Sequence, residues 1–132
     1  MEAHKPVCLI VDDAAVDREM MMRTLARQHP VPHVLTASSL AEARQHLARS
    51  GISLLFLDNM LPDGVGADFL SELAARSDWR RVPVVMVSDW PSPFMFDKAN
   101  TAGVVHVVSK SDFGARYIHA AMDKKLGSKR LN

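Results

Sequence analysis

The stretch that most constrains the fold is residues 54–66, which read LLFLDNMLPDGVG. Its first four residues are apolar and run without polar alternation into a carboxylate, Asp58. A short, continuous apolar run is typical of a strand buried on both faces, as in a parallel α/β sheet. Pro62 and the glycines around it predict the end of the strand and a turn toward a helix. We therefore expect Asp58 at the carboxyl end of a central strand, where open α/β sheets bind ligands, although an aspartate there can also simply cap a turn.

Four further apolar segments repeat this pattern, and segments rich in helix formers separate them. The predicted strands lie at about 7–11, 33–37, 54–57, 83–87 and 104–108. The predicted helices lie at about 15–28, 39–50 and 67–77, in a short segment between Pro93 and Gly103, and at 113–126. Such alternation predicts a parallel sheet covered by helices on both faces. The expected fold class is therefore α/β, with a doubly wound five-stranded parallel sheet.

Local signals mark the inward face of one helix and the start of another. Val16, Met20 and the Thr24/Leu25 pair recur at i, i+4 and i+8 and predict the buried stripe of the first helix. Ser39-Leu40-Ala41-Glu42 is a capping-box pattern, which predicts that the second helix starts at this point.

Composition narrows the class of protein. The chain has 132 residues, of which 48% are hydrophobic and 23% charged, as expected for one globular domain. Sixteen basic residues oppose fifteen acidic ones, and this balance argues against nucleic acid or an anionic membrane as a direct partner. The single cysteine, Cys8, excludes an internal disulfide and favours a reducing compartment. No apolar run has the length of a signal-peptide core or a membrane span, so we expect a cytoplasmic protein.

Polar residues follow the predicted strands, at the point where each strand ends. They are Asp12 and Asp13 after the first strand, Asp58 after the third, Ser88 after the fourth and Lys110 after the fifth. The carboxyl ends of parallel strands share one edge of the sheet, so we expect these side chains to meet. Three neighbouring carboxylates favour a hard divalent cation, and Mg²⁺ is the ion that we expect. With a lysine and a hydroxyl, such a site suits phosphoryl transfer to a carboxylate. Each residue alone has an ordinary explanation as a helix cap, a turn or a solvated charge.

This set of residues resembles the response-regulator receiver domains of bacterial two-component signalling. The likeness runs from about Lys5 to Leu126 and rests on Asp12-Asp13, Asp58, Leu61-Pro62, Gly66, Ser88, Gly103 and Lys110. The separations of 45, 30 and 22 residues between Asp13, Asp58, Ser88 and Lys110 suit that family. The resemblance implies a flavodoxin-like sheet of strand order 2-1-3-4-5. It also implies a receiver domain over residues 1–126, followed by a tail at 127–132.

The resemblance further implies a phosphorylation chemistry. Asp58 would be the phosphoacceptor, and Ser88 and Lys110 would hold the phosphoryl oxygens. The phosphoryl group would come from a histidine kinase or a histidine phosphotransfer protein. The signal would pass to an output protein, or to an output domain absent from this chain. Apart from Mg²⁺-dependent self-phosphorylation and dephosphorylation, the chain would not be an enzyme.

A metal site is implied at the same place. Asp13 and Asp58 would bind Mg²⁺ directly, together with the main-chain carbonyl of Met60. Asp12 would act on the ion through a water molecule.

The chain departs from the family pattern in three places. Asp89 follows Ser88, where alanine or glycine is usual. If its carboxylate faces the phosphoryl site, repulsion between the two negative groups costs about 3 kcal/mol. The alternative is that Asp89 points outward and caps the next loop. Val107 stands three residues before Lys110, where the family usually has a tyrosine or phenylalanine that turns inward on activation. Ser111 replaces the proline that commonly follows the lysine, so a cis bond is not required there.

The sequence fits three other classes of function less well. A phosphorylation-independent adaptor would keep the fold while Asp89 and Val107 reflect lost switching, and this alternative stays open. Aspartyl phosphatases carry a D-x-D pattern, which is missing after the first and third strands. A nucleotide-binding module is disfavoured because no third glycine completes Gly64-Val65-Gly66 and no G-K-[ST] motif exists.

Large apolar residues follow the fourth strand and leave two interpretations open. They are Trp90, Phe94, Met95 and Phe96. They either enter the core or form a partner surface. Within the same segment, Ser92 and Pro93 predict an N-cap and a first helical residue.

Overall fold

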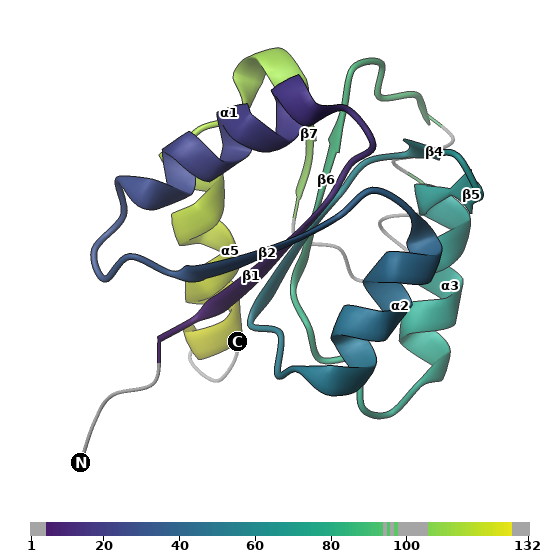
Figure 1. Ribbon diagram of the computed structural model, residues 1–132, viewed down its shortest axis with the longest axis horizontal. Helices are drawn as coiled ribbons and strands as arrows, with labels where there is room; N and C mark the ends of the chain where they lie inside the picture. The colour runs from purple at the N-terminus through teal and green to yellow at the C-terminus, as the bar shows by residue number, and fades with distance from the viewer. Residues whose placement is uncertain (1–4, 94, 96, 98–105, 128–132) are drawn as a thin grey trace.

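Five short apolar segments form the central sheet of the computed structural model, which describes residues 5–93, 95, 97 and 106–127. They are β1 (Val7–Val11), β2 (His33–Ala37), β3 (Leu54–Leu57), β6 (Val84–Ser88) and β7 (His106–Ser109). Neighbouring strands are all parallel, in the order β2-β1-β3-β6-β7. Without the two short strands of a separate hairpin, this is the predicted order 2-1-3-4-5, which is confirmed. Figure 1 shows the sheet passing through the middle of the molecule, with helices on either side.

Helices cover both faces of this sheet, as predicted. α1 (Ala15–Ala26) and α5 (Ala115–Gly127) pack on one face, and α2 (Leu40–Arg49) and α3 (Gly66–Ala75) on the other (Figure 1). Because successive strand residues point to opposite faces, β3 supplies both cores: Leu54 and Phe56 pack with α1 and α5, and Leu55 and Leu57 with α2 and α3. The central strands are therefore buried on both sides, which explains why their sequences are apolar without alternation.

The predicted inward face of α1 is confirmed at Leu25 but wrong at Val16. Met21 and Leu25 are buried, whereas Val16 is 74% exposed and Met20 only half-buried. Met21 and Leu25 stand four residues apart and form the stripe that meets the sheet, and Val16 and Met20 belong to the adjacent stripe, about 100° around the helix. Apolar spacing alone fits both stripes, so the sequence does not distinguish them.

The predicted cap of α2 is present in altered form. Ser39 Oγ accepts the backbone N–H of Glu42 at 3.1 Å, so Ser39 is the N-cap. The Glu42 carboxylate reaches back to the N–H of Ser38 at 2.7 Å rather than to that of Ser39. Farther along the chain, Ser92 Oγ accepts the N–H of Met95 at 3.2 Å, as expected of an N-cap.

The start of the last helix differs from the sequence-based expectation. A short 3₁₀ turn, η1 (Lys110–Asp112), follows β7, so that α5 begins at Ala115 rather than at 113. Gly103 and the first two residues of the predicted strand 104–108 lie outside the described residues. In the described part of the chain, no helix combines the length and apolarity needed to cross a membrane.

A small hairpin after β3, which the sequence did not predict, brings the chain back to the end of that strand. Its strands are β4 (Met60–Leu61) and β5 (Gly64–Val65), and α3 starts directly after it. Gly66 lies so close to the end of β3 that a Cβ atom there would be 2.1 Å from the carbonyl oxygen of Asp58. The N–H of Gly66 also donates to the carbonyl oxygen of Asn59 at 2.6 Å. Only glycine permits this close approach, which holds the loop after Asp58 in place.

Candidate functional site

Polar side chains from four strands meet at the carboxyl edge of the sheet. They border an open hollow of about 470 Å³. Its lining residues are Asp13, Ala14, Asp17, Asp58, Asn59, Met60, Ser88, Asp89, Trp90 and Lys110. Asp12 is fully buried just beneath, within ion-pair distance of Lys110. The structure thus brings together every residue that the sequence singled out for phosphoryl or metal chemistry.

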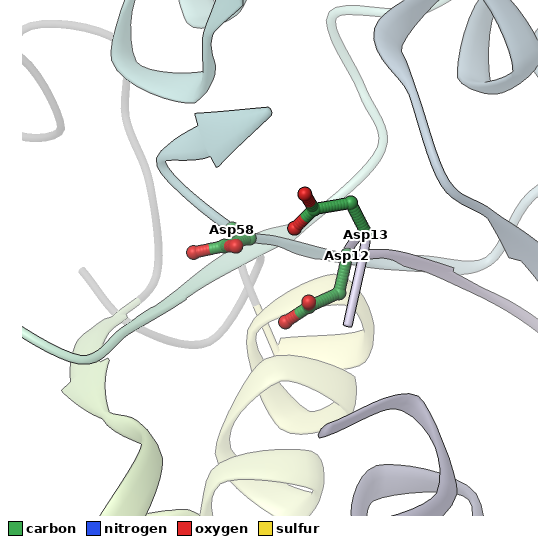
Figure 2. Close-up of side chains that lie close together, drawn as sticks. All are labelled: Asp12, Asp13 and Asp58. Carbon is green, nitrogen blue, oxygen red and sulfur yellow. The ribbon is translucent and has the colours of Figure 1, made fainter. Parts of the chain in front are cut away.

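Three carboxylates form the centre of this site. Asp12 and Asp13 follow β1, and Asp58 follows β3; Figure 2 shows their side chains gathered at the two strand ends. One oxygen of each lies within 4.8 Å of the others, a spacing at which one cation can contact all three. Asp12 and Asp58 are buried, and Asp13 is exposed at the mouth.

Burial makes this cluster electrostatically costly. It raises the pKa of Asp58 to about 6, with the neighbouring charge of Asp12 as the next cause, against the opposing effect of Lys110. Burial also raises the pKa of Asp12, against the N–H of Ala14 and the ammonium of Lys110. Asp12 Oδ2 has no hydrogen-bond partner among the described residues, although Lys110 Nζ forms an ion pair with it at 2.9 Å. The cluster therefore has excess negative charge that a cation would relieve.

Lys110, which follows β7, supplies the positive charge of the site. Its Nζ lies 2.7 Å from Asp17 Oδ2, 2.9 Å from Asp12 Oδ2 and 3.5 Å from Asp58 Oδ2. Its side chain is only 9% exposed. Burial by itself would lower the pKa of Lys110, but the carboxylates of Asp17, Asp12 and Asp58 outweigh it and leave the pKa raised. The ammonium is therefore charged at any physiological pH.

Main-chain and hydroxyl groups complete the site. The carboxylate of Asp58 accepts the N–H of Asn59 at 2.8 Å, and Asn59 Oδ1 accepts the N–H of Ala67 at 2.9 Å, so the loop is bonded on both sides. Ser88 is the buried last residue of β6, and its oxygen accepts the N–H of Trp90 at 3.4 Å. That bond leaves the hydroxyl proton available to an anion in the hollow.

Asp17 is the site residue that sequence reasoning missed. It lies in the first turn of α1 and contacts Lys110 across 93 residues of chain. Its only signal in the sequence is an acidic residue at a helix start, which the helix dipole alone would explain.

The structure locates all three departures from the family pattern. Asp89 lines the hollow with its side chain 63% exposed and its Oδ2 3.9 Å from Lys110 Nζ, so it faces the site from the rim. Val107 is half-buried and packs against the core on the α2 and α3 side. Among the described bonds, the cis peptide is His29–Pro30, and the bond before Ser111 is trans.

The apolar residues after β6 divide between surface and core. Trp90 is 86% exposed at the rim of the hollow, and Met95 is buried. Phe94 and Phe96 lie outside the described residues.

Comparisons with known proteins agree with this arrangement. The family model of the response regulator receiver domain matches residues 8–123. The hydrogenase transcriptional regulatory protein HoxA of Cupriavidus necator is 30% identical over 111 residues, which are 83% of this chain and 22% of that protein. A protein-glutamate methylesterase/protein-glutamine glutaminase of Chromohalobacter salexigens is 32% identical over 118 residues, which are 88% of this chain and 32% of that protein.

A solved structure shares the fold. The response regulator receiver domain protein (CheY-like) from Methanospirillum hungatei JF-1 matches with a TM-score of 0.81 at 19% identity, over 98% of this chain and 100% of that one. The chain spans a third or less of the curated relatives named above, and their activities as whole proteins are not thereby its own. Because the family model covers nearly the whole chain and the sheet has the matching strand order, the chain belongs to the response regulator receiver domain family.

Proposed function

We propose that this domain accepts a phosphoryl group on Asp58 from a histidine kinase or a histidine phosphotransfer protein. The observation that carries the proposal is the position of Asp58, which is buried between two carboxylates and a lysine at the edge of an open hollow. The signal then passes to a partner protein, or to an output domain outside this chain. The relatives named above match this chain over only part of their length, which supports a separation of the receiver domain from the output function.

In the proposed reaction, a carboxylate oxygen of Asp58 attacks the phosphorus atom. A new P–O bond forms, the bond from phosphorus to the donor nitrogen breaks, and its electron pair stays on the donor imidazole. The attacking group must be ionised, and a pKa of about 6 leaves most of Asp58 ionised at neutral pH. Lys110 and the hydroxyl of Ser88 border the same hollow, where they can bind phosphoryl oxygens.

The site also fits Mg²⁺. The donors are all oxygen atoms, as this hard cation requires, and one oxygen from each of the three carboxylates lies within 4.8 Å of the others. Asp13 and Asp58 would hold the ion together with the main-chain carbonyl of Met60, and Asp12 would act through water. When bound, the ion supplies positive charge that offsets the negative charge of the phosphoryl oxygens.

Intact mass spectrometry tests the proposal with acetyl phosphate as donor. We expect the wild type to gain one phosphoryl group when Mg²⁺ is present and none when it is chelated. Asp58→Asn and Asp58→Ala should gain none, whereas the matched surface variant Glu19→Gln should behave as the wild type, because Glu19 is exposed on α1 away from the hollow.

Two outcomes would contradict the proposal. Equal labelling of Asp58→Ala would place the phosphoryl group elsewhere. No labelling of the wild type or of Asp89→Ala, with acetyl phosphate or with histidine phosphotransfer proteins as donors, would favour a phosphorylation-independent adaptor.

A further inference from the structure

The closest partner of Lys110 is Asp17 rather than the proposed phosphoacceptor. Lys110 Nζ donates to Asp17 Oδ2 at 2.7 Å, whereas Asp58 Oδ2 lies 3.5 Å away. Asp17 belongs to the first turn of α1, and Lys110 follows the last residue of β7. This ion pair therefore joins the start of α1 to the carboxyl end of β7, an edge strand of the sheet, across the hollow.

The contact is of a strong kind. Hydrogen bonds between an ammonium and a carboxylate are shorter and stronger than neutral ones. The Lys110 side chain is 9% exposed and that of Asp17 26%, so solvent screens the pair only in part. Asp89 lies farther away, at 3.9 Å, and its side chain is 63% exposed, so it attracts Lys110 much less.

The geometry points to a competition for Lys110. Resting on the proposed function above, we propose that Asp17 is a positioning residue that, beside Asp12 at 2.9 Å, keeps Lys110 Nζ 3.5 Å from Asp58 Oδ2 until a phosphoryl group arrives. Phosphorylation replaces the single negative charge of the Asp58 carboxylate with roughly two negative charges on the phosphoryl oxygens. Lys110 then exchanges Asp17 for a phosphoryl oxygen, and the first turn of α1 loses that anchor.

This exchange gives phosphorylation an effect on α1 that needs no rotating aromatic ring. The first turn of α1 keeps a second tie to the site, because Arg18 Nη1 donates to the carbonyl oxygen of Asp12 at 2.9 Å. When Lys110 leaves Asp17, the first turn of α1 therefore loosens but stays bound to the site through Arg18. Val16, which is 74% exposed, lies in this same turn and would present the change to a partner.

Phosphorylation rates test the competition. The rate of mass gain with acetyl phosphate should be measured at saturating Mg²⁺ for the wild type, Asp17→Asn and Asp17→Glu. Because a hydrogen bond between charged groups is lost, Asp17→Asn should react at least about threefold faster. Asp17→Glu keeps the carboxylate and should stay near the wild-type rate, and so should Glu19→Gln on the solvent side of α1. A purely structural role for Asp17 predicts a slower reaction instead.

Asp89→Asn separates competition from simple charge repulsion. It removes a carboxylate from the same hollow, but one that barely holds Lys110. If Asp89→Asn accelerates the reaction as much as Asp17→Asn, a general charge effect explains both and the inference fails.

Hydrogen exchange of the Arg18 amide tests the loosening of α1. This N–H donates to the carbonyl oxygen of Ala14 at 3.0 Å and reports on the first turn. Exchange should become faster on phosphorylation of the wild type, and should already be fast in unphosphorylated Asp17→Asn. Unchanged exchange in phosphorylated wild type would overturn the inference alone, whereas a wild type that gains no phosphoryl group would overturn the proposed function and the inference together.

Discussion

Asp63 accepts a hydrogen bond from the backbone N–H of Leu40 at 2.8 Å, although the two residues lie 23 positions apart. Its second oxygen accepts the N–H of Ala41 at 2.9 Å. A residue of the hairpin after β3 thus caps α2 from outside, in addition to the cap that Ser39 provides. These bonds hold the pKa of Asp63 below its ordinary value.

This cap makes stability depend on pH in acid. Because the pKa of Asp63 is lower in the folded than in the unfolded chain, its contribution is fully present above the unfolded value of about 4 and is lost as the pH falls through the folded value. We expect Asp63→Asn to lower the Tm by a few degrees near pH 7, because the amide has one acceptor oxygen in place of two. The difference from the wild type should shrink below about pH 4, as circular dichroism melts will show. A difference that grows in acid would contradict this account.

Gly66 should not tolerate a side chain. The new Cβ of Gly66→Ala would meet the carbonyl oxygen of Asp58 at 2.1 Å, and the neighbour is backbone, which cannot move aside cheaply. Overpacking of this kind costs about 1–3 kcal/mol in the free energy of unfolding. Urea titrations should show that loss, together with slower phosphorylation, since the loop after Asp58 must shift. Gly51→Ala is the matched control, because no atom lies within 4 Å of its Cβ, and a comparable loss there would discount the clash.

Mg²⁺ should stabilise the domain through its carboxylate cluster. Binding that is specific to the folded state adds about 2.7 kcal/mol when the ion is at a hundred times its dissociation constant. Differential scanning fluorimetry should therefore show a Tm that rises with Mg²⁺ concentration. Asp13→Asn should remove most of this rise with little damage to the fold, since Asp13 is exposed. An equal rise in Asp13→Asn and in the control Glu19→Gln would show that Mg²⁺ acts elsewhere.

The two tryptophans should report separately on core and site. Trp79 is 5% exposed within the core, whereas Trp90 is 86% exposed and lines the hollow. Phosphorylation should therefore change the fluorescence of wild type and Trp79→Phe alike. Trp90→Phe should lose the response, and quenching by acrylamide should fall most in the same variant. A response carried by Trp79 would mean that the core, not the rim, senses the phosphoryl group.

The sequence was sufficient to predict the sheet and the meeting of its polar ends. Strands such as Leu54–Leu57 are buried on both faces, so their apolar runs are unambiguous, and parallel order then brings Asp12, Asp58 and Lys110 to one edge. The roles assigned to these residues stay predictions until phosphorylation is measured.

What the sequence did not reveal depends on rotation and on long-range contacts. The pairs Val16/Met20 and Met21/Leu25 are both apolar at helical spacing, and only packing against the sheet decides which pair turns inward. The contacts of Asp17 with Lys110 and of Asp63 with Leu40 join segments far apart in the chain. In each case the residue reads locally as an ordinary helix-start or turn aspartate, so no local pattern distinguishes it.

The spread of the site along the chain has a consequence for biosynthesis. Asp12, Asp58 and Ser88 leave the ribosome before Lys110, and the ammonium reaches its carboxylates only when β7 pairs with β6 at the edge of the sheet. A nascent or truncated chain that ends before residue 110 holds the acidic residues without their counter-charge. The phosphoryl transfer proposed above therefore requires a chain that is complete to Lys110 and a β7 strand that is paired in place.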